Sequence, residues 1–139
     1  MKQRNNYLLL VLTIILFASC TNKETRTIAG NWEVLTVNDL SSFEYPADFF
    51  INLETMKIVG FSGCNRFFGS IKTLDNSLVF DKMGGTRKAC PDMTSENLFL
   101  MAMQEVKSFS FNNENLQLLN ENNEVLITLK SIAEEEEEE

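Results

Sequence analysis

Two short cysteine-containing runs constrain the fold of this chain more than any other feature. Residues 63–69 read GCNRFFG, and residues 86–91 read TRKACP. Each run holds one cysteine and one arginine, and the chain has 3 cysteines in all. Since Cys20 has another use, described below, Cys64 and Cys90 are the two that remain. We therefore expect the two runs to meet in space at the most organised point of the fold.

The N-terminal segment has the pattern of a secretory signal. Lys2 and Arg4 precede an apolar run over residues 7–18, which Ser19 and Cys20 follow. The run has the length of a signal-peptide core and is shorter than a membrane-spanning helix. Residues 16–20 look like a bacterial lipobox, so we expect residues 1–19 to be a lipoprotein signal peptide and Cys20 to be acylated. An uncleaved anchor helix and ordinary secretion with a free Cys20 are the alternatives.

The same segment predicts where the protein resides. Lipidation with more than one acyl chain anchors a protein stably, whereas a single chain is marginal. We therefore expect a protein of the cell envelope, attached to a membrane through its lipid. Residue 21 is threonine rather than the aspartate usually linked to inner-membrane retention, which favours the outer membrane. Residues 20–27 are polar and are interpreted as a linker.

The charge balance is acidic, which excludes one class of partner. The chain has 12 Lys and Arg residues against 20 Asp and Glu residues, a formal net charge of -8. Part of the excess is a terminal glutamate run, and we predict an acidic disordered tail over residues 132–139, because like charges keep a segment solvated. Weak contact of the tail with a divalent cation or a basic partner is the alternative. The sequence indicates no basic face that could neutralise phosphates, so nucleic acid is not an expected partner.

Short runs of strand-forming residues separated by polar turns predict an antiparallel sheet. The expected strands are residues 32–37, 49–53, 57–61, 66–72, 77–80, 108–111, 116–119 and 125–129. Gly84 and Gly85 are expected to make a turn. One segment has helical periodicity instead; its apolar stripe is Leu98, Phe99, Ala102, Met103, Val106 and Phe109. Asp92 or Thr94 can cap that helix, and Glu96 suits its positive end. The fold class is therefore α+β, a small antiparallel, barrel-like sheet that wraps one helix.

In this order, four signals resemble the META domain, the family of the HslJ-type heat-shock lipoproteins. They are residues 30–32 (GNW), residues 60–69, residues 86–91, and the closing hairpin over residues 116–129. The resemblance covers residues 28–131, which we take as the domain. It implies a small barrel-like domain with one helix, a link to envelope stress and drug tolerance, and no established catalytic site.

The residue inventory argues independently against an enzyme. The chain has no histidine, so Ser-His-Asp triads, Cys-His pairs and imidazole metal sites are not available. We expect no metal and no cofactor, because Cys64 and Cys90 lack the close paired spacing of structural zinc sites. A small enzyme with an unrecognised carboxylate site remains the alternative, since so many acidic residues always offer some pair.

The expected function is binding, and the candidate residues come from the two cysteine runs. In an oxidising compartment Cys64 and Cys90 can form a disulfide; two buried free thiols are the alternative. The bridge would bring two arginines together, to pair with structural carboxylates or to contact an anion or lipid headgroup. Aromatic residues nearby fit ordinary packing or a groove for a peptide or lipid, with Phe68 as the exposed contact. The partner is expected to be an unknown envelope protein or a hydrophobic ligand, in envelope maintenance or stress response. The candidate binding residues are Asn65, Arg66, Phe67, Phe68, Thr86 and Arg87.

Overall fold

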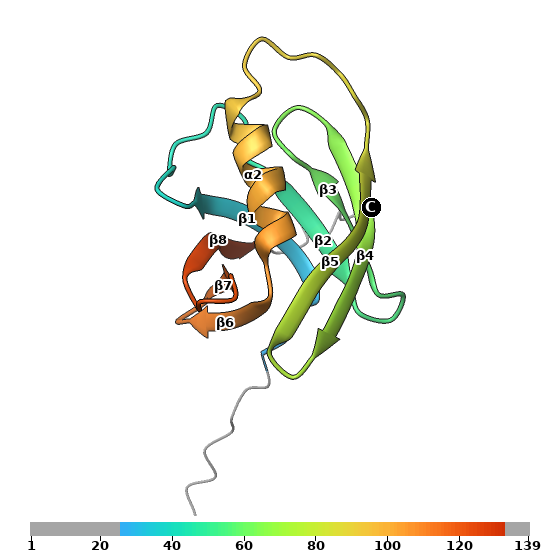
Figure 1. Cartoon of the computed structure of the whole chain (residues 1–139), viewed down its shortest axis with the longest axis vertical. Coiled ribbons are helices and arrows are strands. Elements are labelled where there is room, and N and C mark those ends of the chain that lie inside the picture. The colour runs from blue at the N-terminus through green and yellow to red at the C-terminus, as the bar shows by residue number, and fades with distance from the viewer. Residues whose placement is uncertain (1–25, 133–139) are drawn as a thin grey trace, which may run out of the picture.

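The computed structural model describes residues 26–132. The predicted signal peptide, the acylated Cys20 and residues 133–139 of the predicted tail lie outside the described residues. Within that range the chain forms eight strands and one helix, shown in Figure 1. In chain order these are β1 (Gly30–Val37), β2 (Asp48–Asn52), β3 (Lys57–Phe61), β4 (Arg66–Leu74), β5 (Ser77–Gly85), α2 (Thr94–Glu105), β6 (Ser108–Asn112), β7 (Asn115–Leu119) and β8 (Val125–Ile132).

The strands form one closed antiparallel ring. Each strand pairs with the next along the chain, and β1 also pairs with β8, which closes the sheet. Tight polar turns make this possible, because Asn and Asp tolerate the left-handed backbone that such turns need. Asp75, Asn113 and Asn123 all have positive φ angles at these turns. The α+β class, with a closed antiparallel sheet and one helix packed against it, is thus confirmed.

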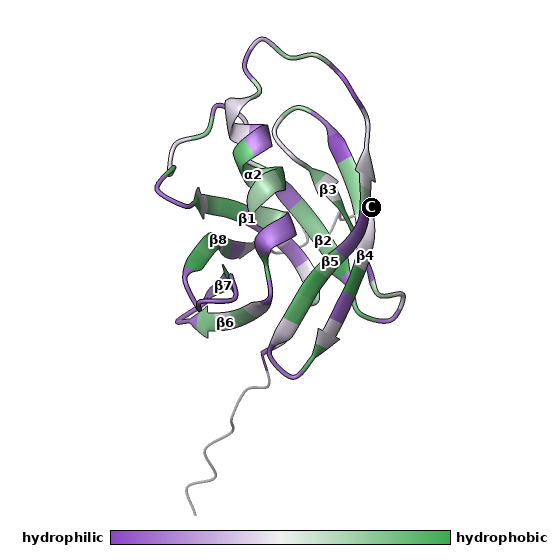
Figure 2. Ribbon diagram, in the orientation of Figure 1, coloured by the Kyte–Doolittle hydropathy of each residue, from purple (hydrophilic) through white to green (hydrophobic). Residues whose placement is uncertain are grey.

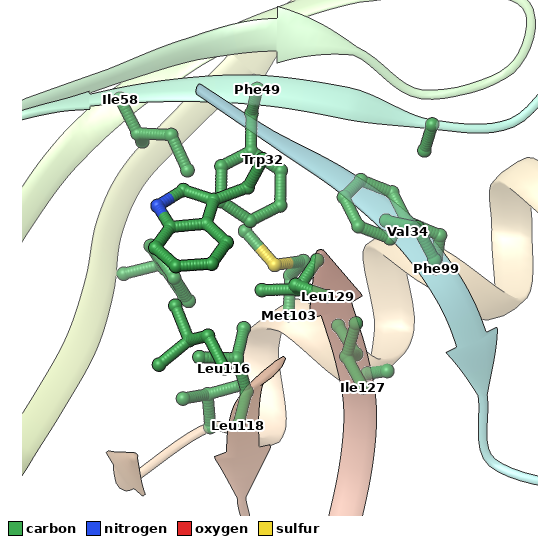
Figure 3. Packing of buried hydrophobic residues seen from close by; sticks show 14 of the residues in the cluster. Trp32, Val34, Phe49, Ile58, Phe99, Met103, Leu116, Leu118, Ile127 and Leu129 are labelled. Atoms are coloured by element: carbon green, nitrogen blue, oxygen red, sulfur yellow. The ribbon is translucent and has the colours of Figure 1, made fainter. Parts of the chain in front are cut away.

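The core lies between the inner face of the ring and one face of α2. Inward positions alternate along the strands, as in β1, where Trp32 and Val34 are buried. From α2, Phe99 is 1% exposed and packs against Phe49 and Phe67, with ring centroids 6.3 and 5.6 Å away. Figure 3 shows Phe49 and Phe99 in the same core as the side chains of Leu116 and Leu118 from β7 and of Ile127 and Leu129 from β8. In Figure 2 hydrophobic and hydrophilic residues alternate along α2, as expected for a helix with one buried face.

The helix is shorter than its predicted apolar stripe. It ends at Glu105, and Val106 is already extended, with φ -61 and ψ 131. The next residue is held by strands, because the Lys107 N–H donates to the Leu119 carbonyl at 2.8 Å. Phe109 therefore lies in β6, which confirms the strand predicted over residues 108–111 and excludes Phe109 from the helix stripe. At the other end Met93 occupies the N-cap position, while Asp92 Oδ1 accepts the Thr94 N–H at 2.8 Å.

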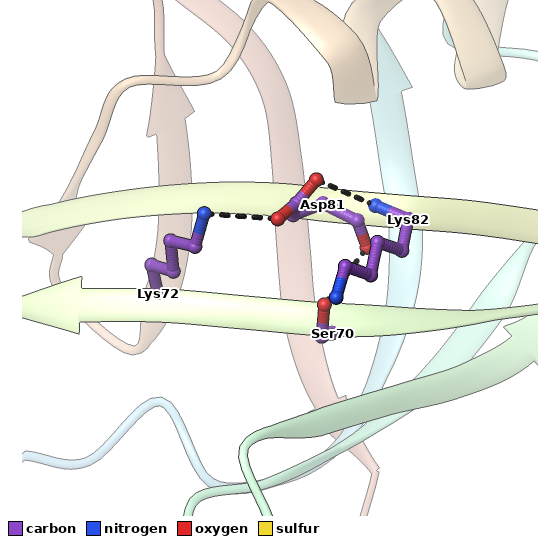
Figure 4. Close-up of polar contacts among 4 residues, drawn as sticks. All are labelled: Ser70, Lys72, Asp81 and Lys82. Atoms are coloured by element: carbon purple, nitrogen blue, oxygen red, sulfur yellow. Dashed lines mark hydrogen bonds and ion pairs between the residues drawn. The ribbon is translucent and has the colours of Figure 1, made fainter.

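The strand β5 is longer than predicted, and the turn expected at Gly84 and Gly85 was wrong. Both glycines pair with β4. At Gly85 the two strands approach so closely that a Cβ would lie 2.5 Å from the Arg66 carbonyl oxygen. A register shift precedes them, where Lys82 has a φ of 51°. Figure 4 shows how polar contacts hold this region: Asp81 pairs with the Lys72 ammonium at 2.9 Å and accepts the Lys82 N–H at 2.8 Å.

The ring has one weak seam, between β5 and β6. On the edge of β5 opposite β4, the strand pairs with β6 at one residue pair only, Ser77 with Ser108. The helix α2 packs against β5, β1 and β8. In Figure 1 the helix stands in front of the ring beside β5. In the part of the chain that the structure describes, no helix has both the length and the apolar character needed to cross a bilayer.

Candidate functional site

A buried carboxylate fixes the start of α2 to the turn before β4. Glu96 is 3% exposed although it is an acidic residue. The Ser62 hydroxyl and the Asn65 N–H both donate to its Oε1, the latter at 2.9 Å, and Asn65 Nδ2 donates to Oε2 at 3.0 Å. A buried carboxylate costs a large desolvation energy unless such donors satisfy it. Gly63, with a φ of 104°, supplies the left-handed turn that aims these donors at Glu96.

The same asparagine joins the two cysteine runs. Asn65 Oδ1 accepts the Thr86 hydroxyl at 2.9 Å and the Lys88 N–H at 2.6 Å. The Arg66 N–H in turn donates to the Thr86 hydroxyl at 3.1 Å. Asn65 thus uses both ends of its amide, one toward the helix and one toward residues 86–88. We call Ser62, Asn65 and Glu96 the polar anchor.

A disulfide holds the same two runs together covalently. Cys64 and Cys90 are bonded to each other across 26 residues of chain, with their Cα atoms 6.3 Å apart. The bridge lies beside the polar anchor, since Asn65 follows Cys64 directly and Glu96 belongs to the helix that follows Cys90. Residues 63–65 are therefore tied to the segment before α2 by one covalent bond and several hydrogen bonds.

Above the polar anchor, a cavity of about 450 Å³ opens between α2 and the end of β5. We call this the α2–β5 groove. Its strand side is formed by Met83, Gly84, Gly85, Thr86, Arg87 and Lys88, and its helix side by Met93, Glu96, Asn97, Leu100 and Gln104. The wall is mixed, with apolar side chains along the groove and cationic side chains at one end. Such a mixture suits an elongated ligand with an apolar body and an anionic end.

The structure brings most of the predicted binding residues to this groove. Asn65, Arg66, Phe67, Thr86 and Arg87 all line it. Their roles differ, because Asn65 is 6% and Phe67 is 4% exposed, whereas Arg66, Thr86 and Arg87 are exposed. Asn65 and Phe67 therefore form the buried floor of the groove, whereas the three exposed residues can reach a ligand.

Within residues 26–132 neither arginine forms an ion pair with a carboxylate, which was one of the two expected roles. The ion pairs in that range are Lys72 with Asp81 and Lys130 with Glu33. Arg66 nevertheless lies near enough to Asp48 to lower the pKa of that carboxyl. Arg87 and Lys88 are thus available to an anionic group in the groove, and Arg66 adds a positive charge that Asp48 partly offsets.

Phe68 faces a different surface from the rest of the predicted set. It is 59% exposed and lines a second cavity, of about 460 Å³, on the outside of β1 to β4. Arg66 and Asp48 line that cavity too. Partial burial and the charge of Glu33 raise the pKa of Asp48, and the nearby Arg66 guanidinium lowers it in part.

Sequence reasoning missed Ser62, Glu96 and Lys88. As a sequence signal, Glu96 predicts only a favourable charge at the start of the helix. Its spacing carried a stronger signal, because positions 96, 99 and 103 fall on one helix face, and that face is the buried one. Among residues 26–132, no three His, Cys, Asp or Glu side chains are grouped so that they could hold a metal ion.

Comparisons with known proteins give a family and a fold. The family model of the META domain matches residues 25–132. No curated protein matches the sequence. An NMR structure of a protein from Burkholderia xenovorans is 22% identical and has a TM-score of 0.57, with 75% of this chain and 82% of that chain covered. A second NMR structure is 24% identical with a TM-score of 0.56, over 73% of this chain and 87% of that one. At such identities the likeness shows the fold alone.

Proposed function

The chain belongs to the META domain family, and from that premise we propose that it is a lipid-anchored, non-enzymatic binding protein of the cell envelope. It would attach to the outer membrane through an acylated Cys20 and hold a protein partner or a hydrophobic ligand in the α2–β5 groove. Its role would be envelope maintenance or the response to stress, including heat shock. The observation that carries the proposal is the groove itself, with its apolar walls and its three cations at one end.

The hydrogen bonds of Glu96 support a structural role for this residue in the proposed site. Both carboxylate oxygens accept hydrogen bonds from Ser62 and Asn65, and removal of those bonds would release the start of α2. We therefore assign Glu96 to the support of the groove.

Site-specific photo-crosslinking in cells tests the binding proposal. A benzophenone amino acid replaces Asn97, which is exposed and lines the groove, and in a matched variant it replaces Met101, which is 60% exposed on the same helix outside the groove. We expect an adduct from the variant at position 97 and none from the variant at position 101. Equal adducts from the two positions, or none from position 97, would contradict the proposal.

Mass spectrometry of the membrane fraction tests the anchor separately. We expect residues 1–19 to be missing and the new N-terminal Cys20 to carry acyl chains. A Cys20→Ser variant should move to the soluble fraction or keep its leader. An intact Met1 in the mature protein, or a soluble unmodified product, would refute the lipoprotein assignment and leave the groove proposal untouched.

A further inference from the structure

We propose that the occupant of the α2–β5 groove is an extended peptide segment of a partner protein, which pairs with the open edge of β5 and places an acidic group against the cationic end. This inference rests on the proposed function, because it names the kind of partner that the same groove would hold. Three observations carry it: an open strand edge, the length of the groove, and positive charge at one end.

The first observation is the edge of β5 that faces the groove. Beyond the Ser77 to Ser108 pair, no described strand pairs with β5 on this side. The Thr86 N–H points the other way and donates to the Arg66 carbonyl at 3.0 Å. Because backbone groups alternate in direction along a strand, the N–H groups of Gly85 and Met83 then face the groove. An unpaired edge of this kind can accept an added strand, the geometry of β-augmentation.

The second observation is the length of the groove. One wall is formed by the last residues of β5, Met83 to Gly85, and by the loop residues 86–88 that follow the strand. The helix wall runs from Met93 to Gln104, which is about 16 Å at about 1.5 Å per residue. A strand of about five residues would fill that length. Its side chains would meet Leu100 and Met93 on the helix side.

The third observation is the charge at one end. Arg66, Arg87 and Lys88 line the groove and form no ion pair with residues 26–132, although Asp48 lies near Arg66 and partly offsets its charge. The loop over residues 86–93 joins this end of β5 to the first turn of α2, so the three cations share one end of the groove. Guanidinium groups bind carboxylates through paired hydrogen bonds. An acidic side chain or a C-terminal carboxylate on the peptide would therefore fix its direction.

A fatty acid would also present an apolar body and an anionic end, yet it would leave the edge of β5 unpaired. The backbone groups of Met83 and Gly85 give an added strand hydrogen bonds that an acyl chain cannot make. Backbone pairing is thus the feature that separates the two occupants, and the test is built on it.

The probe is a displayed library of peptides of about seven residues, slightly longer than the groove, selected on the purified full chain. The best peptide is then synthesised with N-methyl groups at alternate residues, in each of the two possible frames. In a strand paired with β5, only one frame has its N–H groups directed at β5. We expect that frame to lose affinity by about tenfold or more and the other frame to keep it.

Matched variants localise the effect to the groove. Asn97→Trp fills the groove from the helix side, and Met101→Trp adds the same bulk outside it. Arg87→Glu reverses a charge at the cationic end, and Lys57→Glu does so at an exposed position on β3 that does not line the groove. Only the first member of each pair should weaken the selected peptide, with thermal unfolding curves showing that all four variants fold.

The outcomes separate this inference from the function on which it rests. Equal binding by both N-methylated frames, or equal loss in a matched pair, would overturn the peptide-strand assignment. A second outcome is that no peptide is selected, that dodecanoate binds the unmodified chain, and that Asn97→Trp weakens this binding. The peptide assignment is then wrong, and a hydrophobic ligand fills the groove. If neither probe binds, the proposed function fails together with this inference.

Discussion

The two sides of β5 are held in different ways. On one side the strand pairs with β4 along its length, from Ser77 to Gly85. On the other side it shares a single residue pair with β6, and the helix α2 packs there instead. Strand pairing therefore closes most of this ring, whereas the seam is held by a few backbone hydrogen bonds, such as that from the Leu78 N–H to the Lys107 carbonyl, and by the attachment of α2. That helix is attached by its apolar face, by the disulfide before it and by the polar anchor.

The apolar attachment of α2 should be the strongest of the three. Phe99→Ala removes a side chain that is 1% exposed and should lower the free energy of unfolding by about 3 to 5 kcal/mol, the cost of a large cavity. Met101→Ala, at a position that is 60% exposed, should change it by less than about 0.5 kcal/mol. Denaturant titration measures both. A loss below about 1 kcal/mol for Phe99→Ala would mean that the helix does not seal the ring.

The disulfide should contribute slightly less. Closing 26 residues of chain stabilises the fold by about 3 to 4 kcal/mol in the chain-entropy model. Cys64→Ala combined with Cys90→Ala should lose that amount. In a Cys20→Ser background, thiol titration of the denatured, unreduced chain should detect no free sulfhydryl, and two free thiols would refute the bridge.

The polar anchor should have a smaller effect. Glu96→Gln keeps the shape of the side chain but turns an amide N–H₂ toward donors of Ser62 and Asn65, which should cost about 1 to 3 kcal/mol. Glu105→Gln changes an exposed residue at the other end of α2 and should be nearly silent. If both variants unfold at the same denaturant concentration as the unmodified chain, the anchor does not hold the helix.

The smallest effect should be the pH dependence of the free energy of unfolding that comes from Asp48 on β2, a strand paired along both edges. Burial and Glu33 raise the pKa of Asp48 above 3.8. The folded chain therefore binds this proton at a pH where the unfolded chain has released it, so stability rises as the pH falls toward 3.8. Relative to Asp48→Asn, the unmodified chain should gain stability between pH 7 and about pH 4. A loss over that range, or no change, would contradict the assigned shift.

Asp81 on β5 provides a comparison of opposite sign. The hydrogen bond from Lys72 lowers the pKa of Asp81 below 3.8, assisted by the Lys82 N–H. Its contribution is present above the pKa of the unfolded chain and is lost as the pH falls through the lowered value. Relative to Asp81→Asn, the unmodified chain should lose stability below about pH 4. The same acid titration of both variants measures the two effects.

Local patterns in the sequence were enough for the fold class. Alternating strands and one helical stripe predict a sheet around a helix, since each signal lies within a few residues of chain. The error at Gly84 and Gly85 has a non-local cause, because their role as strand residues depends on how closely β4 approaches. Phe109 fits the helical period equally well, and only the pairing of β6 with β7 removes it from the helix.

The candidate site was predictable in part for the same reason. The two cysteine runs identified the residues around the groove, since both runs are compact in sequence. The groove itself depends on the edge of β5 that lacks a partner, which is set by the register of the whole ring. The burial of Glu96 depends on the donors of Ser62 and Asn65, about thirty residues earlier in the chain. No local pattern reveals such pairing.

Hydrogen exchange along β5 tests the central claim most directly, because it reports on the two sides of one strand in a single experiment. The N–H groups of Leu78 and Thr86 donate to the carbonyls of Lys107 and Arg66, each at 3.0 Å, and should exchange slowly. The N–H groups of Met83 and Gly85 face the groove and should exchange at least about tenfold faster in the free chain. Equal protection of all four amides would show that the edge of β5 is already covered, and would contradict the account.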